Sequence, residues 1–205
     1  MIVDVAPGLW IWRVEHPGSE SAAHRERTVT CTCVESAGEI AVLDALAPPK
    51  DANAVWERLD ARPPTLAIVL KPNHVRDVDV FVNRYGARGF GPWLFWRANI
   101  PKTSLEPIEP GTVIPGGFVA LADGRGRNET PLWLPEQHTI VFADALTAPR
   151  GELRVSTSPA RTEPVLTALS KLLELPFERV IVSHGEPVHS RVEYEHALDR
   201  ASWQG

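Results

Sequence analysis

Cysteine is scarce in this chain, which contains only Cys31 and Cys33. The two residues lie two positions apart in a segment of alternating character, so both side chains point to the same face of a strand. A Cys-x-Cys pair can bind a metal ion, but the chain has no second cysteine pair to complete such a site. We therefore expect two buried, reduced thiols.

Long apolar runs are also missing. No stretch approaches the roughly 18 apolar residues that a membrane-spanning helix needs. Residues 1–10 lack the basic start and the long apolar core of a signal peptide. We therefore expect a cytoplasmic protein that has no membrane partner.

Neither sign of charge dominates, because 21 basic residues stand against 26 acidic ones and the net charge is -5. No long run of either sign occurs, which argues against nucleic acid and anionic membranes as partners. The expected partner is a small-molecule ligand. A length of 205 residues suits one domain with a sizeable core, so residues 1–205 are assigned to a single domain.

Turn-forming residues are abundant, with 19 prolines and 14 glycines, as expected of a fold with short strands and many loops. Residues 8–14 and 28–34 are rich in β-branched and aromatic residues that alternate, which predicts two antiparallel strands. Residues 40–44 form a third predicted strand that ends in an acid. Strands therefore dominate the start of the chain.

Helices are predicted between the later strands. Asp51 is expected to cap the first of them. The second covers residues 78–85 and ends at Gly86, which suits the position after a helix. Two more are expected near residues 163–173 and 190–203.

Three apolar strands each end in a loop with ionisable side chains. The strands at 66–70, 140–143 and 180–182 lead to His74 and Asp77, to Asp144, and to His184, respectively. Ligands and catalytic groups in sheet proteins collect at strand ends, where a rigid scaffold directs side chains from several loops to one point. These side chains are therefore predicted to meet in one pocket.

Two of these strand ends carry motifs of a known family. Residues 142–146 read Phe-Ala-Asp-Ala-Leu, and residues 182–188 read Val-Ser-His-Gly-Glu-Pro-Val. With the order of the elements, they resemble the metallo-β-lactamase superfamily, in which one strand typically ends in Gly-Asp-x-Leu and a late strand in His-Gly-x-Pro. The resemblance covers nearly the whole chain.

The resemblance implies an α/β fold, a four-layer αββα sandwich in which helices flank two mixed sheets. Asp144 matches the aspartate that bridges two metal ions in the family. His184 matches the last histidine ligand.

The family's main signature, Thr-His-x-His-x-Asp-His, is missing after residue 70, where residues 71–78 read Lys-Pro-Asn-His-Val-Arg-Asp-Val. If Asp77 takes the place of the aspartate, the histidines are lost. If the alignment shifts by one residue, His74 and Arg76 take the two histidine positions and the aspartate is lost. Either alignment destroys the first metal site.

Arg125 stands where the third histidine of that site is expected. A guanidinium group cannot ligate zinc, because it stays protonated and has no free lone pair. The first metal site is therefore missing this ligand as well.

The leading hypothesis is a hydrolase-like protein with a reduced site. Asp77, Asp144 and His184 would be its catalytic residues and would hold one zinc or other divalent transition metal, with His74 as a fourth ligand. The metal would activate water for attack on an ester, thioester, lactone or phosphoester. A site that binds no metal agrees with the sequence equally well, so enzymatic activity stays open.

The competing hypothesis is a binding protein without catalysis, in which Arg76 and Arg125 receive a small anion in the same cleft. Among the tryptophans, Trp93 and Trp96 in the proline-rich connector of residues 92–115 are the better candidates to line a substrate cleft. His74 is a further candidate for substrate or anion binding. A third hypothesis is a scaffold that forms a homodimer through its tryptophan-bearing surface.

Overall fold

Two sheets form the centre of the computed structural model, which describes residues 2–16, 28–95, 97–125 and 129–200. The first sheet has seven strands in chain order. They are β1 (Ile2–Ala6), β2 (Leu9–Glu15), β3 (Thr28–Ser36), β4 (Glu39–Leu43), β5 (Leu66–Ile68), β6 (Arg88–Gly91) and β7 (Glu106–Pro107). Strands β1 to β4 pair antiparallel and β4 to β7 pair parallel, so the sheet is mixed.

The second sheet has six strands in the order β15-β14-β11-β10-β9-β8. They are β8 (Val113–Ile114), β9 (Phe118–Ala120), β10 (Leu132–Leu134), β11 (Thr139–Phe142), β14 (Arg179–Val182) and β15 (Val188–Ser190). Strands β11 and β14 are parallel and the other pairs antiparallel, so this sheet is mixed too. A separate antiparallel pair joins β12 (Leu146–Thr147) to β13 (Arg154–Val155).

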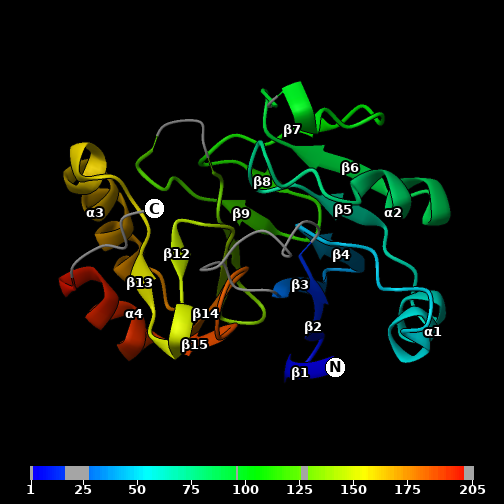
Figure 1. Ribbon diagram of the computed structural model, residues 1–205, viewed down its shortest axis with the longest axis horizontal. Coiled ribbons are helices and arrows are strands. Elements are labelled where there is room, and N and C mark those ends of the chain that lie inside the picture. Colours follow the sequence, from blue (N-terminus) through cyan, green and yellow to red (C-terminus); the bar gives the residue numbers. More distant parts are fainter. Residues whose placement is uncertain (1, 17–27, 96, 126–128, 201–205) are drawn as a thin grey trace.

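Four α-helices cover the outer faces of the two sheets (Figure 1). Helices α1 (Asn53–Ala61) and α2 (Val78–Tyr85) lie against the first sheet, and α3 (Thr162–Lys171) and α4 (Arg191–Asp199) against the second. Short 3₁₀ turns lie at η2 (Arg97–Asn99), η3 (Pro149–Gly151), η4 (Pro159–Arg161) and η5 (Leu172–Glu174). The expected αββα sandwich is confirmed. In the described part of the chain, no helix has the length and apolar character needed to cross a membrane.

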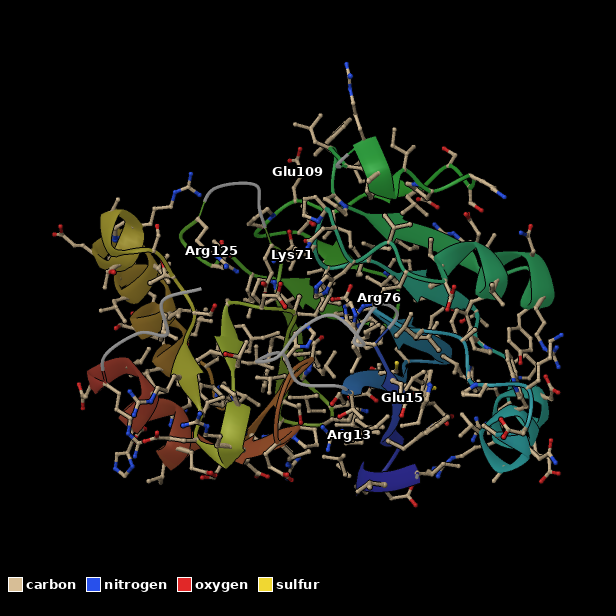
Figure 2. All side chains as sticks on the ribbon, viewed as in Figure 1. Arg13, Glu15, Lys71, Arg76, Glu109 and Arg125 are labelled. Atoms are coloured by element: carbon tan, nitrogen blue, oxygen red, sulfur yellow. The ribbon has the colours of Figure 1, made fainter. Side chains whose placement is uncertain are left out.

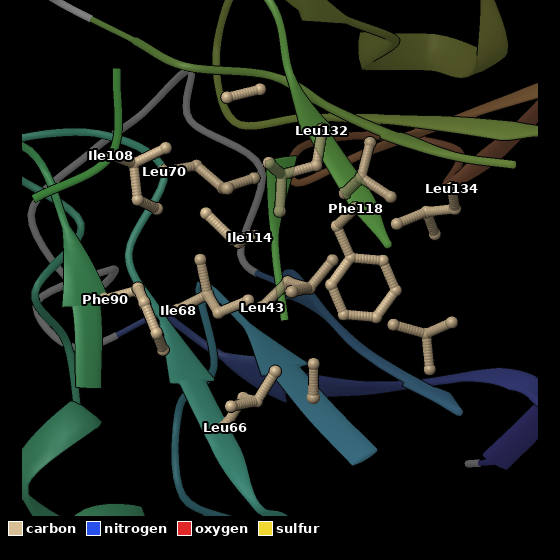
Figure 3. Close-up of a cluster of buried hydrophobic side chains, with 14 of the residues drawn as sticks. Leu43, Leu66, Ile68, Leu70, Phe90, Ile108, Ile114, Phe118, Leu132 and Leu134 are labelled. Carbon is tan, nitrogen blue, oxygen red and sulfur yellow. The ribbon is translucent and has the colours of Figure 1, made fainter. Parts of the chain in front are cut away.

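Apolar side chains fill the space between the two sheets. Figure 3 shows Leu43, Leu66 and Ile68 of the first sheet together with Phe118 and Leu132 of the second. All five are at most 2% exposed. Burial of each such side chain contributes about 1.5–3 kcal/mol to stability, so this layer holds the sheets together.

The outer layers explain why the strands of the first sheet are apolar on both faces. Leu9 and Ile11 of β2 belong to the cluster between the sheets, whereas Trp10 and Trp12 belong to the cluster beneath α1 and α2. Successive strand residues point to opposite faces, so a strand covered on both sides is apolar throughout.

Several local predictions are confirmed. Gly86 ends α2 in the left-handed conformation with φ 68°. Cys31 and Cys33 are buried free thiols in the same cluster. Burial raises the pKa of both thiols to about 12, which keeps them protonated and unreactive.

Other local predictions are wrong or incomplete. Asp51 does not cap α1, whose N-cap is Ala52 and has no side-chain hydrogen bond. Strands β1, β6, β7, β8, β12, β13 and β15 were not predicted. All of them except β1 have only two to four residues, so the alternation that marks a strand hardly develops.

Helix α4 begins with a capping box. The Ser190 hydroxyl accepts a hydrogen bond from the Glu193 amide, and the Glu193 carboxylate accepts one from the Ser190 amide. We expect Ser190→Ala to lower the free energy of unfolding by about 1 kcal/mol, measured by urea denaturation. Ser170→Ala, an exposed serine of α3, serves as the control and should change stability by less than about 0.5 kcal/mol. Equal stability of the two variants would contradict the role of the capping box.

Candidate functional site

Side chains from three strand ends meet at one edge of the sheets. His74 follows β5, Asp144 follows β11 and His184 follows β14. One potential ligand atom of each residue lies within 4.8 Å of the others. His74 Nε2 is 3.3 Å from Asp144 Oδ2, and His184 Nε2 is 3.3 Å from Asp144 Oδ1. The predicted meeting of Asp144 and His184 is confirmed, and His74 joins them.

The topology explains this meeting. Strands β11 and β14 pair parallel with Phe142 opposite Val182, so both chains leave the second sheet at the same edge. The first sheet is tied to that edge by an antiparallel bridge between Val29 and His184. The Thr30 amide also donates a hydrogen bond of 2.9 Å to the Ser183 carbonyl. The site therefore lies where the two sheets come together.

His74 is oriented from behind by a buried carboxylate. Its Nδ1 lies 2.9 Å from Asp44 Oδ2, and Asp44 Oδ1 accepts a 2.7 Å hydrogen bond from the Leu70 amide. The contact with Asp44 fixes the ring so that Nε2 faces Asp144, as in the carboxylate-histidine pairs behind metal ligands. Burial and Arg76 lower the pKa of His74, but Asp44 and Asp144 outweigh them and raise it.

Asp44 also has a strained backbone, because its φ is +46°. A non-glycine residue in this region costs of order 1–3 kcal/mol and persists where the surrounding structure holds it. Here the holding contacts are the Leu70 amide and the His74 ring.

Asp144 is held at its backbone by Glu129. The buried Glu129 carboxylate accepts hydrogen bonds of 2.8, 2.7 and 2.8 Å from the amides of Ala143, Asp144 and Ala145. Burial raises the pKa of Glu129 to about 7, although Arg125 acts to lower it. The loop that presents Asp144 is therefore fixed by a side chain from a different segment.

Lys71 adds a cation to the site. Its Nζ forms an ion pair with Asp144 Oδ2, and the Lys71 side chain is only 12% exposed. Figure 2 shows Lys71 near the middle of the molecule, between Arg125 and Arg76 in that view. Burial acts to raise the pKa of Asp144, but His74, His184 and Lys71 hold it well below the usual range. The carboxylate is therefore ionised.

Asp77 lies outside the group of three. Asp77 lies at the N-cap position of α2, and its Oδ2 accepts a 2.8 Å hydrogen bond from the Ala47 amide. Asp77 was expected to be one of three ligands and His74 only a fourth. In the structure, His74 is the third member of the group and Asp77 is not part of it.

The two arginines have different surroundings. Arg125 is held by Asp123 at 2.6 Å and by Glu129 at 2.7 Å, and both carboxylates are buried. Two carboxylates of the chain therefore already pair with the Arg125 guanidinium. Arg76 donates from Nη1 to the Asp44 carbonyl, while its Nη2 is buried without a hydrogen-bond partner among the described residues.

Four residues near the site were not predicted as parts of it: Lys71, Asp44, Glu129 and His16. The ring of His16 lies 6.2 Å from that of His184. The sequence contains one indication for Asp44, because this acid ends the strand predicted at residues 40–44. The others had none, because a single lysine, glutamate or loop histidine is usually a solvated surface residue.

The fold and the site together define the class, which is the metallo-β-lactamase fold. The structure is similar to a metallo-β-lactamase family protein from Thermus thermophilus, with a TM-score of 0.66 and 17% identity over 94% of this chain and 79% of that one. It is also similar to FIM-1 from Pseudomonas aeruginosa in its mono-zinc form, with a TM-score of 0.72 and 15% identity over 97% and 93% of the two chains. For TMB-1 the TM-score is 0.73 and the identity 9%, over 97% and 95%. No family model and no curated protein sequence matches the chain.

Of the two alignments with the family's signature, the one that places His74 on the first histidine agrees with a site that contains His74 and leaves Asp77 out.

Gly185, which follows His184, has no room for a side chain. Its φ is +93°, and a Cβ atom there would clash with the carbonyl group of Ala148. Its neighbours on either side hydrogen-bond to Ala148, since the Ala148 amide donates to the His184 carbonyl and the Glu186 amide donates to the Ala148 carbonyl.

We expect Gly185→Ala to lower the free energy of unfolding by roughly 2–4 kcal/mol, because strain and overlap add together. Gly38→Ala is the matched control, with φ +83° and nothing within 4 Å of the added carbon. It should cost only about 1–2 kcal/mol from backbone strain. Urea denaturation measures both, and equal losses would show that the contact with Ala148 has no effect.

Proposed function

We propose that this protein is a hydrolase that holds one divalent transition metal at His74, Asp144 and His184. The observation that carries the proposal is the meeting of three potential ligand atoms within 4.8 Å, on side chains from three strand ends. Asp44 orients one of these ligands, as expected behind a metal site.

The donor set fits such a metal. Two imidazole nitrogens and one carboxylate suit zinc and its neighbours, and three protein ligands leave a position open for water or substrate. Asp144 Oδ1 supports the fit, because it is buried and faces His184 Nε2 at 3.3 Å without a well-formed hydrogen bond within the described part of the chain. Buried acceptors are normally satisfied, and a cation between the rings would satisfy this one.

Different residues around the site would have different roles in the reaction. Asp44 holds the His74 ring, and Glu129 holds the loop of Asp144, so the ligands are oriented in advance. A metal bound there would supply a water of lowered pKa and would polarise a carbonyl or phosphoryl oxygen. Lys71 places a positive charge beside Asp144, where it can stabilise the negative charge that develops on the substrate.

The bonds that this chemistry suits are those of esters, thioesters, lactones and phosphoesters. All develop negative charge on an oxygen when water attacks, and the nearby cation Lys71 favours that charge.

A second candidate function is the binding of a small anion without a metal. Arg76 Nη2 favours it, because this donor is buried and lacks a hydrogen-bond partner among the described residues. An anion that reaches Nη2 would satisfy this donor. Arg125 takes no part, since Asp123 and Glu129 hold it.

Metal titration tests the first candidate. We expect protein purified without a histidine tag and stripped with chelator to bind one Zn²⁺ or Co²⁺ per chain in calorimetry. Asp144→Asn should weaken binding roughly 100-fold or more, because it removes the only anionic ligand. Asp77→Asn is the matched control and should bind as the wild type does. Equal losses in both variants, or no binding by the wild type, would overturn the ligand set.

Lys71 provides a second test, because its ammonium group competes with a metal for Asp144 Oδ2. We expect Lys71→Met to bind Zn²⁺ roughly 10- to 100-fold more tightly in competition with a chelator, since a charge-assisted contact no longer has to break. Lys50→Met, an exposed lysine, should not change the affinity. Weaker binding by Lys71→Met would mean that Lys71 orients Asp144 and does not compete.

A further inference from the structure

A pocket lies beside the candidate site, at the same edge of the first sheet. Strands β5 and β6 are parallel neighbours, so the segments that follow them leave the sheet together. The segment after β5 carries Lys71, and the segment after β6 carries Trp93. Ligands in such sheets bind outside the carboxyl ends of the parallel strands.

The pocket has a volume of about 140 Å³ and is lined by Pro92, Trp93, Ile108, Glu109, Pro110 and Thr130. Its inner wall is well packed, since Ile108 is 3% and Thr130 7% exposed. Its outer wall is the indole of Trp93, which is 55% exposed. None of these residues belongs to the proposed metal group.

The pocket and the site are connected through Thr130. The Thr130 amide donates a 2.8 Å hydrogen bond to the carbonyl of Leu70, the residue before Lys71. Thr130 also directly follows Glu129, whose carboxylate binds the Asp144 amide. A substrate whose reacting bond lies at Asp144 would therefore extend toward this pocket with its neighbouring group.

The chemistry of the lining selects an apolar group of limited size. The walls are largely an indole, two prolines and an isoleucine, so water in the pocket is readily displaced by an apolar group. A cavity of about 150 Å³ holds a benzene ring, which matches the volume here. A flat ring also offers its face or edge to the Trp93 indole.

Glu109 gives the pocket a charge preference. The Trp93 Nε1 donates a 2.8 Å hydrogen bond to Glu109 Oε1, which orients the indole and places a carboxylate at the pocket. The carboxylate disfavours a ring that carries its own negative charge.

We propose that this pocket receives an uncharged aromatic ring of the substrate, next to the bond that is hydrolysed. Its position relative to that bond rests on the proposed function. The proposal narrows the substrate class to esters, thioesters, lactones or phosphoesters that carry a phenyl-sized group close to the reacting centre.

Binding of benzyl alcohol to chelator-treated, metal-free protein tests the pocket, with ligand-observed NMR titration as the readout. We expect Trp93→Ala to weaken binding roughly tenfold, since it removes the outer wall. Leu94→Ala is the matched control, because this exposed neighbour does not line the pocket. Circular dichroism checks that both variants fold. No binding by the wild type, or equal losses in the two variants, overturns the pocket.

Two further probes test the stated ligand chemistry. We expect cyclohexylmethanol and benzoate to bind more weakly than benzyl alcohol, and Glu109→Gln to narrow the gap between benzoate and benzyl alcohol. Equal binding of cyclohexylmethanol overturns the preference for an aromatic ring. Tighter binding of benzoate overturns the preference for an uncharged one. Because no metal is present, these outcomes are independent of metal binding at His74, Asp144 and His184.

Discussion

The ionised carboxylate of Asp144 is the group on which the rest of the site depends. A buried negative charge must be compensated, and Lys71, His74 and His184 all face it. Together with Asp144 they come from three strand ends in two sheets, so compensation is possible only when both sheets are assembled. The same charge is what makes the group suitable for a metal ion, which the proposed function uses.

A second set of buried charges supports Asp144 from behind. Arg125 pairs with both Asp123 and Glu129, and Glu129 in turn accepts three backbone hydrogen bonds around Asp144. Arg125 stands where the family resemblance implies a histidine ligand. At this position the chain therefore has a structural ion pair that fixes the loop of the one remaining carboxylate ligand.

Features that depend on neighbouring residues could be predicted from the sequence, and features that depend on distant residues could not. Gly86 was correctly placed because a helix end is decided by neighbouring residues. His184 and Asp144 could be paired because each follows a strong apolar strand. The exchange of Asp77 for His74 could not be predicted, because it depends on how the loop after β5 turns, with Asp77 bonded to Ala47 and His74 to Asp44. Those partners are about 30 residues away in the chain.

The order of apolar strands and helices, with the two motifs around Asp144 and His184, was enough to define the four layers and two members of the site. Periodicity and motifs are local properties of the chain, so they can be recognised in the sequence without the structure. The ion pair of Lys71, the support from Glu129 and the pocket at Trp93 exist only after distant loops pack together. Side-chain direction within a loop follows from tertiary contacts that no local pattern encodes.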